Sequence, residues 1–179
     1  HLETPNLQFH VSPASTDFLG KTTLHNFPAF TPTIVNLRPT SRGKIEIKSS
    51  DTRISPKIQM NYLSTDEDRE MAGKAIKITR NIVMNSKAFK EYEPEELRPG
   101  VNITDNETLA KEAGKYANTI FHPVSTCRMG NDEKAVVNDK LVTHGLENLR
   151  IVDASIMPHI TSGNTNAPTI MIADRKSVV

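Results

Sequence analysis

The 179-residue sequence contains a single cysteine, Cys127, which excludes an internal disulfide. One cysteine cannot form a thiolate cluster for zinc either, and the histidines show no metal-ligand spacing, so we expect no metal site. Such low cysteine usage favours a reducing compartment, and we therefore expect a cytoplasmic location.

Long apolar runs are also lacking. The longest, such as residues 170–173, are far shorter than the roughly 20 residues that a membrane-spanning helix needs. Charge of one sign is equally scarce, because 22 Lys and Arg stand against 21 Asp and Glu. We therefore expect no membrane span and no nucleic-acid partner. Aromatic residues, at 5%, are too few to argue for a cage around a quaternary ammonium group.

Alternation of apolar and polar residues predicts several strands in the first third of the chain. The pattern occurs at residues 7–11, 44–48 and 58–62, and the run 33–37 reads as a further strand, the second along the chain. Proline and glycine within residues 38–43 predict a turn that joins the second and third strands as a hairpin.

Helices are predicted after this strand-rich region. A capping-box signature at residues 64–67 opens a helix to about Asn85, and another at residues 104–107 opens a shorter one through roughly Tyr116. Residues 136–137 and 149–152 are short strand candidates. Strands followed by helices, without regular alternation, predict an α+β fold with a mainly antiparallel sheet packed against a few helices.

One polar segment, residues 121–130, places His122 before a proline and ahead of small hydroxyl and thiol residues. A neutral imidazole accepts a proton close to neutral pH, so His122 is a candidate general base. The alternative is a purely structural histidine. Cys127 is a candidate nucleophile in the same segment, although a buried, unreactive cysteine explains it more simply. We expect Arg128 to pair with a carboxylate or with carbonyl groups.

A second polar segment, residues 162–166, is a Gly/Asn loop that runs into an apolar helix with Pro168 near its first turn. The start of such a helix presents unpaired N–H groups and a partial positive charge, which would stabilise an anionic group lying across it. The alternative is an Asn cap on a surface helix. The acidic residues within 91–96 indicate a solvated loop.

Taken together, these segments resemble the glucose-methanol-choline (GMC) family of FAD-dependent alcohol oxidases and dehydrogenases. The similarity is ordered and colinear, and a weaker likeness occurs at residues 37–43. The residues that carry it are 122–130 (HPVSTCRMG), 136–139 (VVND), 144–158 (HGLENLRIVDASIMP) and 162–173 (SGNTNAPTIMIA).

The resemblance implies oxidation of a CH–OH group, with removal of the hydroxyl proton and hydride transfer from the alcohol carbon to N5 of FAD. His122 would be the base, and Asn166 would occupy the partner position that is His or Asn in relatives. Choline or another small primary alcohol would be the substrate. The sequence does not separate an oxidase from a dehydrogenase.

The resemblance also implies which residues approach FAD. Asn164 and the backbone from Thr165 to Thr169 would lie near the pyrimidine side of the isoalloxazine, and Asp153 and Ala154 near the ribose and diphosphate. A turn residue at a strand end is the alternative for Asp153. The full set of implied cofactor-binding residues is Asp153, Ala154, Asn164, Thr165, Asn166, Ala167 and Thr169.

Two departures from the family pattern are visible. The Gly-x-Gly-x-x-Gly fingerprint of dinucleotide binding does not occur in the sequence, and Ser125 stands where glycine is common in the family. We therefore expect residues 1–179 to be the C-terminal, substrate-binding portion of a larger FAD enzyme. Residues 151–179 would return to a missing N-terminal FAD-binding domain. Alone, this chain should hold FAD weakly or not at all and should have no turnover.

A different class of function stays open from the sequence. The chain could be a non-catalytic, stand-alone α+β interaction module that kept the fold without the cofactor.

Overall fold

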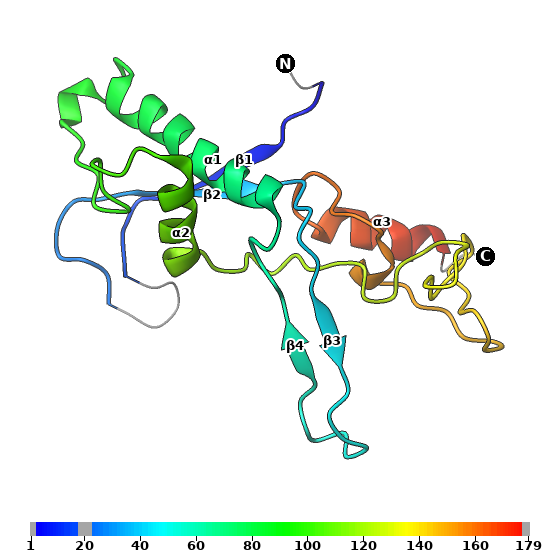
Figure 1. Cartoon of the computed structure of the whole chain (residues 1–179). Helices are drawn as coiled ribbons and strands as arrows, with labels where there is room; N and C mark the ends of the chain where they lie inside the picture. Colours follow the sequence, from blue (N-terminus) through cyan, green and yellow to red (C-terminus); the bar gives the residue numbers. More distant parts are fainter. Residues whose placement is uncertain (1–2, 18–22, 177–179) are drawn as a thin grey trace. The chain divides into compact units, whose positions relative to one another are not determined.

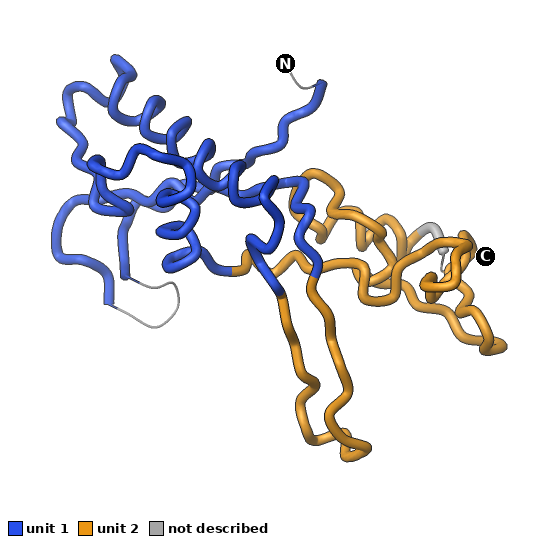
Figure 2. The backbone as a smooth tube through the Cα atoms, in the orientation of Figure 1, with its two compact units in different colours: residues 1–42, 61–118 blue, residues 43–60, 119–179 orange. Residues whose placement is uncertain are grey.

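The computed structural model describes residues 3–17 and 23–176, and it divides into two compact units (Figures 1 and 2). Unit 1 comprises residues 1–42 and 61–118, and unit 2 comprises residues 43–60 and 119–179. Within the described part of the chain, no helix is both long enough and apolar enough to cross a membrane.

Unit 1 combines a two-stranded antiparallel sheet with two helices. Its buried apolar side chains are Leu37, Ala75, Leu109 and Ala110, so the helices contribute most of the small core. The elements are β1 (Leu7–Ser12), β2 (Thr31–Asn36), α1 (Asp66–Asn85), a 3-10 turn (Lys90–Tyr92) and α2 (Asn106–Tyr116).

Both predicted helices are confirmed, but each N-cap lies one residue later than the start of its predicted capping box. Thr65 caps α1 by accepting from the Asp68 backbone N–H at 3.3 Å. Asp105 caps α2 by accepting from the Thr108 N–H at 2.8 Å. In each case the cap bonds to the third helical residue, which is the usual acceptor geometry for Thr and Asp at this position.

The predicted hairpin across residues 38–43 is wrong. β2 pairs with β1, with Ile34 opposite Phe9, while β3 (Lys44–Glu46) pairs with β4 (Lys57–Gln59). The physical reason lies in the turn, whose backbone N–H groups bond to a helix side chain instead of continuing a ladder. That side chain is Asp68 in the first turn of α1.

Asp68 is a buried carboxylate, only 5% exposed, that fastens this turn to α1. One oxygen accepts from the Thr40 N–H and the other from the Ser41 N–H, both at 2.9 Å, and Asn36 donates at 3.3 Å. Burial by itself would raise the pKa of Asp68, but the hydrogen bonds from Ser41 and Thr40 together hold the pKa below its usual value. Asp68 is therefore an ionised anchor in the folded state.

Replacing Asp68 with Asn should lower the free energy of unfolding by about 2 kcal/mol at neutral pH, because the amide group cannot accept both turn N–H groups. A carboxylate with a lowered folded pKa stabilises the protein above its unfolded pKa of about 3.9 and loses that effect as the pH falls through the folded pKa. Urea denaturation should thus show a gap between wild type and Asp68→Asn at pH 7 that closes in acid. Asp66→Asn, whose side chain is 97% exposed, is the matched control; a gap that persists unchanged in acid would contradict this account.

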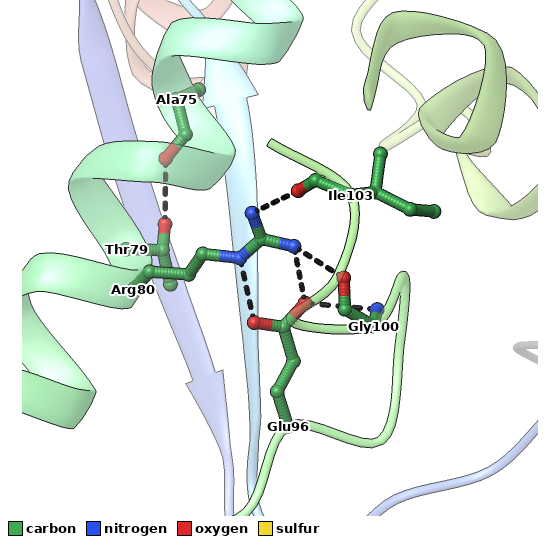
Figure 3. A network of polar contacts seen from close by, with 6 residues as sticks. All are labelled: Ala75, Thr79, Arg80, Glu96, Gly100 and Ile103. Atoms are coloured by element: carbon green, nitrogen blue, oxygen red, sulfur yellow. Dashed lines mark hydrogen bonds and ion pairs between the residues drawn. The ribbon is translucent and has the colours of Figure 1, made fainter. Parts of the chain in front are cut away.

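A second polar network in unit 1 holds the segment 94–103 against α1 (Figure 3). Arg80 of α1 donates to both carboxylate oxygens of Glu96, at 2.7 and 2.8 Å, and to the carbonyl oxygens of Gly100 and Ile103. Glu96 also accepts from the Gly100 N–H at 3.0 Å. The interpretation of residues 91–96 as a solvated loop is therefore wrong for Glu96, whose side chain is only 11% exposed.

Unit 2 builds its core mostly from irregular backbone. Val137, Leu141, Ile156 and Met157 form the buried cluster. The strand candidates at residues 136–137 and 149–152 contribute only isolated bridges, which pair Met129 with Val137, Val137 with Thr143, and Val142 with Arg150. Besides β3 and β4, the regular elements are a 3-10 turn (Ala154–Ile156) and α3 (Asn166–Lys176).

The α+β class with antiparallel strand pairing is confirmed, although the strands form two separate two-stranded sheets. In β3 and β4 every residue is exposed, including Ile45 and Ile58, which lie opposite each other in the ladder. This ladder therefore contributes backbone pairing to unit 2 without adding to its buried cluster.

Candidate active site

His122 lies in a backbone segment whose conformation is closely constrained. The preceding residue, Phe121, adopts a left-handed φ of 64° and donates its N–H to the Thr119 hydroxyl at 3.0 Å. Pro123 follows and restricts His122 to extended conformations. A left-handed conformation costs a bulky residue about 1–2 kcal/mol, and such strain is concentrated at functional sites.

Both nitrogens of the half-buried His122 ring have hydrogen-bond partners from the loop before α3. Nδ1 lies 3.0 Å from the Thr165 hydroxyl, and Nε2 lies 2.8 Å from the Asn164 side-chain nitrogen. The two polar segments, some forty residues apart in the sequence, thus meet at this imidazole within unit 2. Two contacts on opposite sides of the ring fix its orientation.

The amide that contacts His122 belongs to Asn164, whereas Asn166 is the exposed first residue of α3. The catalytic role of Asn166 therefore stays a prediction, and so do the cofactor contacts of Asn164, Thr165, Ala167 and Thr169. Sequence reasoning assigned Asn164 and Thr165 to the cofactor and missed that both side chains hold His122. Hydroxyl and amide residues alternate in this loop, so the sequence does not indicate which of these side chains turns toward His122.

The start of α3 provides donors without any charged side chain. The Thr165 carbonyl accepts from the Thr169 N–H at 3.1 Å and from its hydroxyl at 2.6 Å, so the helix begins at once after Thr165. The N–H groups of Asn166 and Ala167 have no partner within the helix, and the positive end of the helix dipole lies there. Residues 162–173 contain no acid and no base. This set of donors fits the polar, partly anionic edge of a reduced flavin, so these residues are compatible with FAD.

Asp153 caps the 3-10 turn that follows it. Its carboxylate accepts from the Ser155 N–H at 2.7 Å, and Ala154 opens the turn and packs against the buried cluster. The turn role considered for Asp153 is thus present in the structure, and the side chain is exposed. An approach of Asp153 and Ala154 to the ribose and diphosphate of FAD stays a prediction.

Arg128 and Cys127, in the same segment as His122, make contacts within the fold. Arg128 pairs with Asp132, as expected for an anchor, and that guanidinium together with the Lys134 N–H lowers the pKa of Asp132 to about 2. Cys127 is half-buried, and its backbone N–H donates to the Ser155 carbonyl. Among the residues that the structure describes, no group of His, Cys, Asp and Glu side chains could hold a metal ion.

Ser125 has a left-handed φ of 76°, which explains why glycine suits this position. Its hydroxyl shares its one hydrogen between the carbonyl oxygens of Met157 and Pro158, at 2.8 and 2.9 Å. This bifurcated hydrogen bond offsets part of the strain and ties the His122 segment to the end of the 3-10 turn. The departure from glycine is therefore compatible with the geometry of the segment.

Comparison with known proteins identifies the family of this chain. The family model described as GMC oxidoreductase matches residues 39–173. Oxygen-dependent choline dehydrogenase of Pseudomonas syringae pv. tomato is 41% identical over 175 residues, which cover 97% of this chain and 30% of that protein. The enzyme of the same name from Proteus mirabilis is 44% identical over 173 residues, which cover 96% of this chain and 30% of that protein.

Solved structures give the same result. Pyridoxine 4-oxidase from Mesorbium loti superposes with a TM-score of 0.81 at 30% identity, covering 89% of this chain and 31% of that one. A formate oxidase variant from Aspergillus oryzae, with a TM-score of 0.89 at 21% identity, covers 99% of this chain and 31% of that one and supports the fold alone.

The chain belongs to the GMC oxidoreductase family of FAD-dependent enzymes and corresponds to their C-terminal portion. It spans about 30% of the length of the curated relatives that it matches. Those relatives carry the name oxygen-dependent choline dehydrogenase.

Proposed function

We propose that this chain is the substrate-side portion of an FAD-dependent enzyme that oxidises choline or a similar small primary alcohol. The observation that carries the proposal is His122, whose ring nitrogens are held by Asn164 and Thr165 beside the donor-rich start of α3. The substrate class rests on relatives named choline dehydrogenase at 41–44% identity. A cytoplasmic location remains part of the proposal.

In the proposed reaction, Nε2 of His122 takes the hydroxyl proton of the alcohol. Nε2 has a single lone pair, so the Asn164 amide, which lies 2.8 Å from Nε2, gives up this contact when the alcohol binds and donates instead to the oxygen from which the proton leaves. Asn166 stands as a further polar group at the helix start. A bound FAD would supply the acceptor for the hydride of the carbinol carbon, and the alcohol would leave as an aldehyde. Orientation of the imidazole and of the donor amide is what this chain contributes.

We further propose that residues 1–179 form the C-terminal portion of the enzyme and that residues 151–179 pack against an FAD-binding domain outside this chain. Exposed apolar side chains on α3 support this, because Ile170 is 59% and Met171 is 53% exposed. The sequence lacks the glycine fingerprint for the FAD diphosphate. By itself the chain should therefore neither retain FAD nor turn over.

The test compares two proteins, this chain alone and the same chain joined to an N-terminal FAD-binding region. The longer protein should purify yellow and reduce an electron-accepting dye when choline is added, and should react more slowly with a panel of other primary alcohols. The chain alone should be colourless and inactive. A longer protein that binds flavin yet oxidises none of the alcohols would contradict the proposed function.

A further inference from the structure

Thr165 occupies the cap position of α3, but its hydroxyl does not serve the helix in the way that the other caps do. In α1 and α2 the cap side chain accepts from the N–H of the third helical residue, Asp68 or Thr108. The third residue of α3 is Pro168, which has no N–H. The hydroxyl that would cap the helix is thereby released from that role.

The Thr165 hydroxyl contacts the His122 ring instead. Thr165 is 6% exposed, and its Oγ1 is 3.0 Å from Nδ1 of the imidazole. Its backbone is held at the same time, because the Thr165 carbonyl accepts both the N–H and the hydroxyl of Thr169. A buried hydroxyl on a fixed backbone is a well-defined partner for a ring nitrogen.

The two contacts together define which ring nitrogen carries the proton. The Asn164 side-chain N–H donates to Nε2, so Nε2 presents its lone pair and Nδ1 carries the hydrogen. Nδ1–H then donates to Thr165 Oγ1. When Nε2 gains a proton, Nδ1–H keeps the same partner, so this contact needs no rearrangement and becomes charge-assisted.

We propose that Thr165 is a positioning residue: the Asn164 amide sets the Nδ1–H tautomer of His122, and the Thr165 hydroxyl holds that tautomer by accepting from Nδ1–H. Pro168 makes this possible by removing the competing N–H at the helix start. The consequence for catalysis rests on the proposed function, in which Nε2 is the atom that takes the alcohol proton. The tautomer itself does not depend on that function.

The experiment uses the flavin-loaded full-length protein with 15N in its histidine rings, and His122→Gln assigns the His122 signals by their loss. Long-range proton–nitrogen correlations should show a protonated Nδ1 and an unprotonated Nε2 in the wild type. Thr165→Val should produce a mixture of tautomers and lower kcat about tenfold with little change in KM, the size of effect that one hydrogen bond allows. Thr165→Ser keeps the hydroxyl and should restore both the tautomer and most of the rate.

Pro168→Ala tests the role of the proline separately. The new N–H at position 168 should bond to the Thr165 hydroxyl, which then caps α3 in the usual way. Nδ1 of His122 loses its partner, so the tautomer population of His122 should shift in the same direction as in Thr165→Val. Wild-type His122 protonated at Nε2, or a tautomer unchanged in Thr165→Val, would overturn the proposal. A protein that shows the expected tautomers but oxidises no alcohol would support this inference and contradict only the proposed function.

Discussion

Replacing His122 with Gln is expected to lower kcat for choline oxidation by about 10²–10⁴-fold in the flavin-loaded full-length protein, the usual contribution of a general base. Glutamine keeps a hydrogen-bonding side chain of similar reach but has no group that accepts a proton at neutral pH. The yellow colour should remain, because His122 is proposed to act on the substrate and not to hold the cofactor. Dye-coupled turnover and the flavin spectrum measure the two effects separately.

His144→Gln provides the matched control for this prediction. His144 lies in the same unit and within the family segment 144–158, but its Nε2 contacts the Gly130 carbonyl, at 3.1 Å, and the residue is exposed. Its replacement should leave kcat nearly unchanged. Equal losses in the two variants would assign the effect on His122 to folding, and an unchanged rate in His122→Gln would remove His122 from the mechanism.

Glu96→Gln is expected to lower the free energy of unfolding by about 3 kcal/mol, because it leaves the Arg80 guanidinium largely buried without its counter-charge. Side-chain exposures of 18% for Arg80 and 11% for Glu96 show that water replaces little of the lost contact. Burial would raise the pKa of Glu96, but the Arg80 guanidinium and the Gly100 N–H hold it below its usual value. The stabilisation should therefore be present at neutral pH and be lost as the pH falls through that lowered pKa.

Urea denaturation at neutral pH measures this effect, and Glu107→Gln is the control. Glu107 pairs with Lys111 one turn along α2, but the two side chains are 79% and 69% exposed, so solvent screens the pair. The Glu107 variant should unfold at the wild-type midpoint. Equal shifts for the two glutamates would show that the network of Figure 3 contributes no more than a surface ion pair.

Local signals in the sequence predict the helices well. The apolar spacing and polar starts of α1 and α2 locate both helices, with caps displaced by one residue to Thr65 and Asp105. The reason for the displacement is that Ser/Thr/Asp neighbours in each start sequence can all cap, and propensity alone does not choose among them.

Strand pairing was predicted less well because it depends on distant residues. The turn at residues 38–43 has ordinary hairpin composition, yet the Asp68 carboxylate, some 27 residues away, takes its N–H groups. Glu96 was likewise predicted to be solvated because its partner Arg80 is 16 residues away and nothing in the local sequence indicates the pair. Contacts of this kind emerge only when the chain is folded.

The site was predicted in part. The resemblance to the GMC family placed His122 and the loop before α3 in one functional region, and the structure brings Asn164 and Thr165 onto the imidazole. The resemblance to the family assigned Asn166 as the partner group, whereas the amide that lies at Nε2 in the structure belongs to Asn164. The role of Asn166 therefore stays a prediction.

The central claim is that His122 takes the hydroxyl proton while the alcohol reduces a bound flavin. Its most direct test is anaerobic mixing of the flavin-loaded full-length protein with choline, followed by the absorbance of the flavin in a single turnover. The account predicts rapid bleaching in the wild type and bleaching slowed by about 10²–10⁴-fold in His122→Gln at saturating choline. Bleaching at the same rate in both proteins would contradict it.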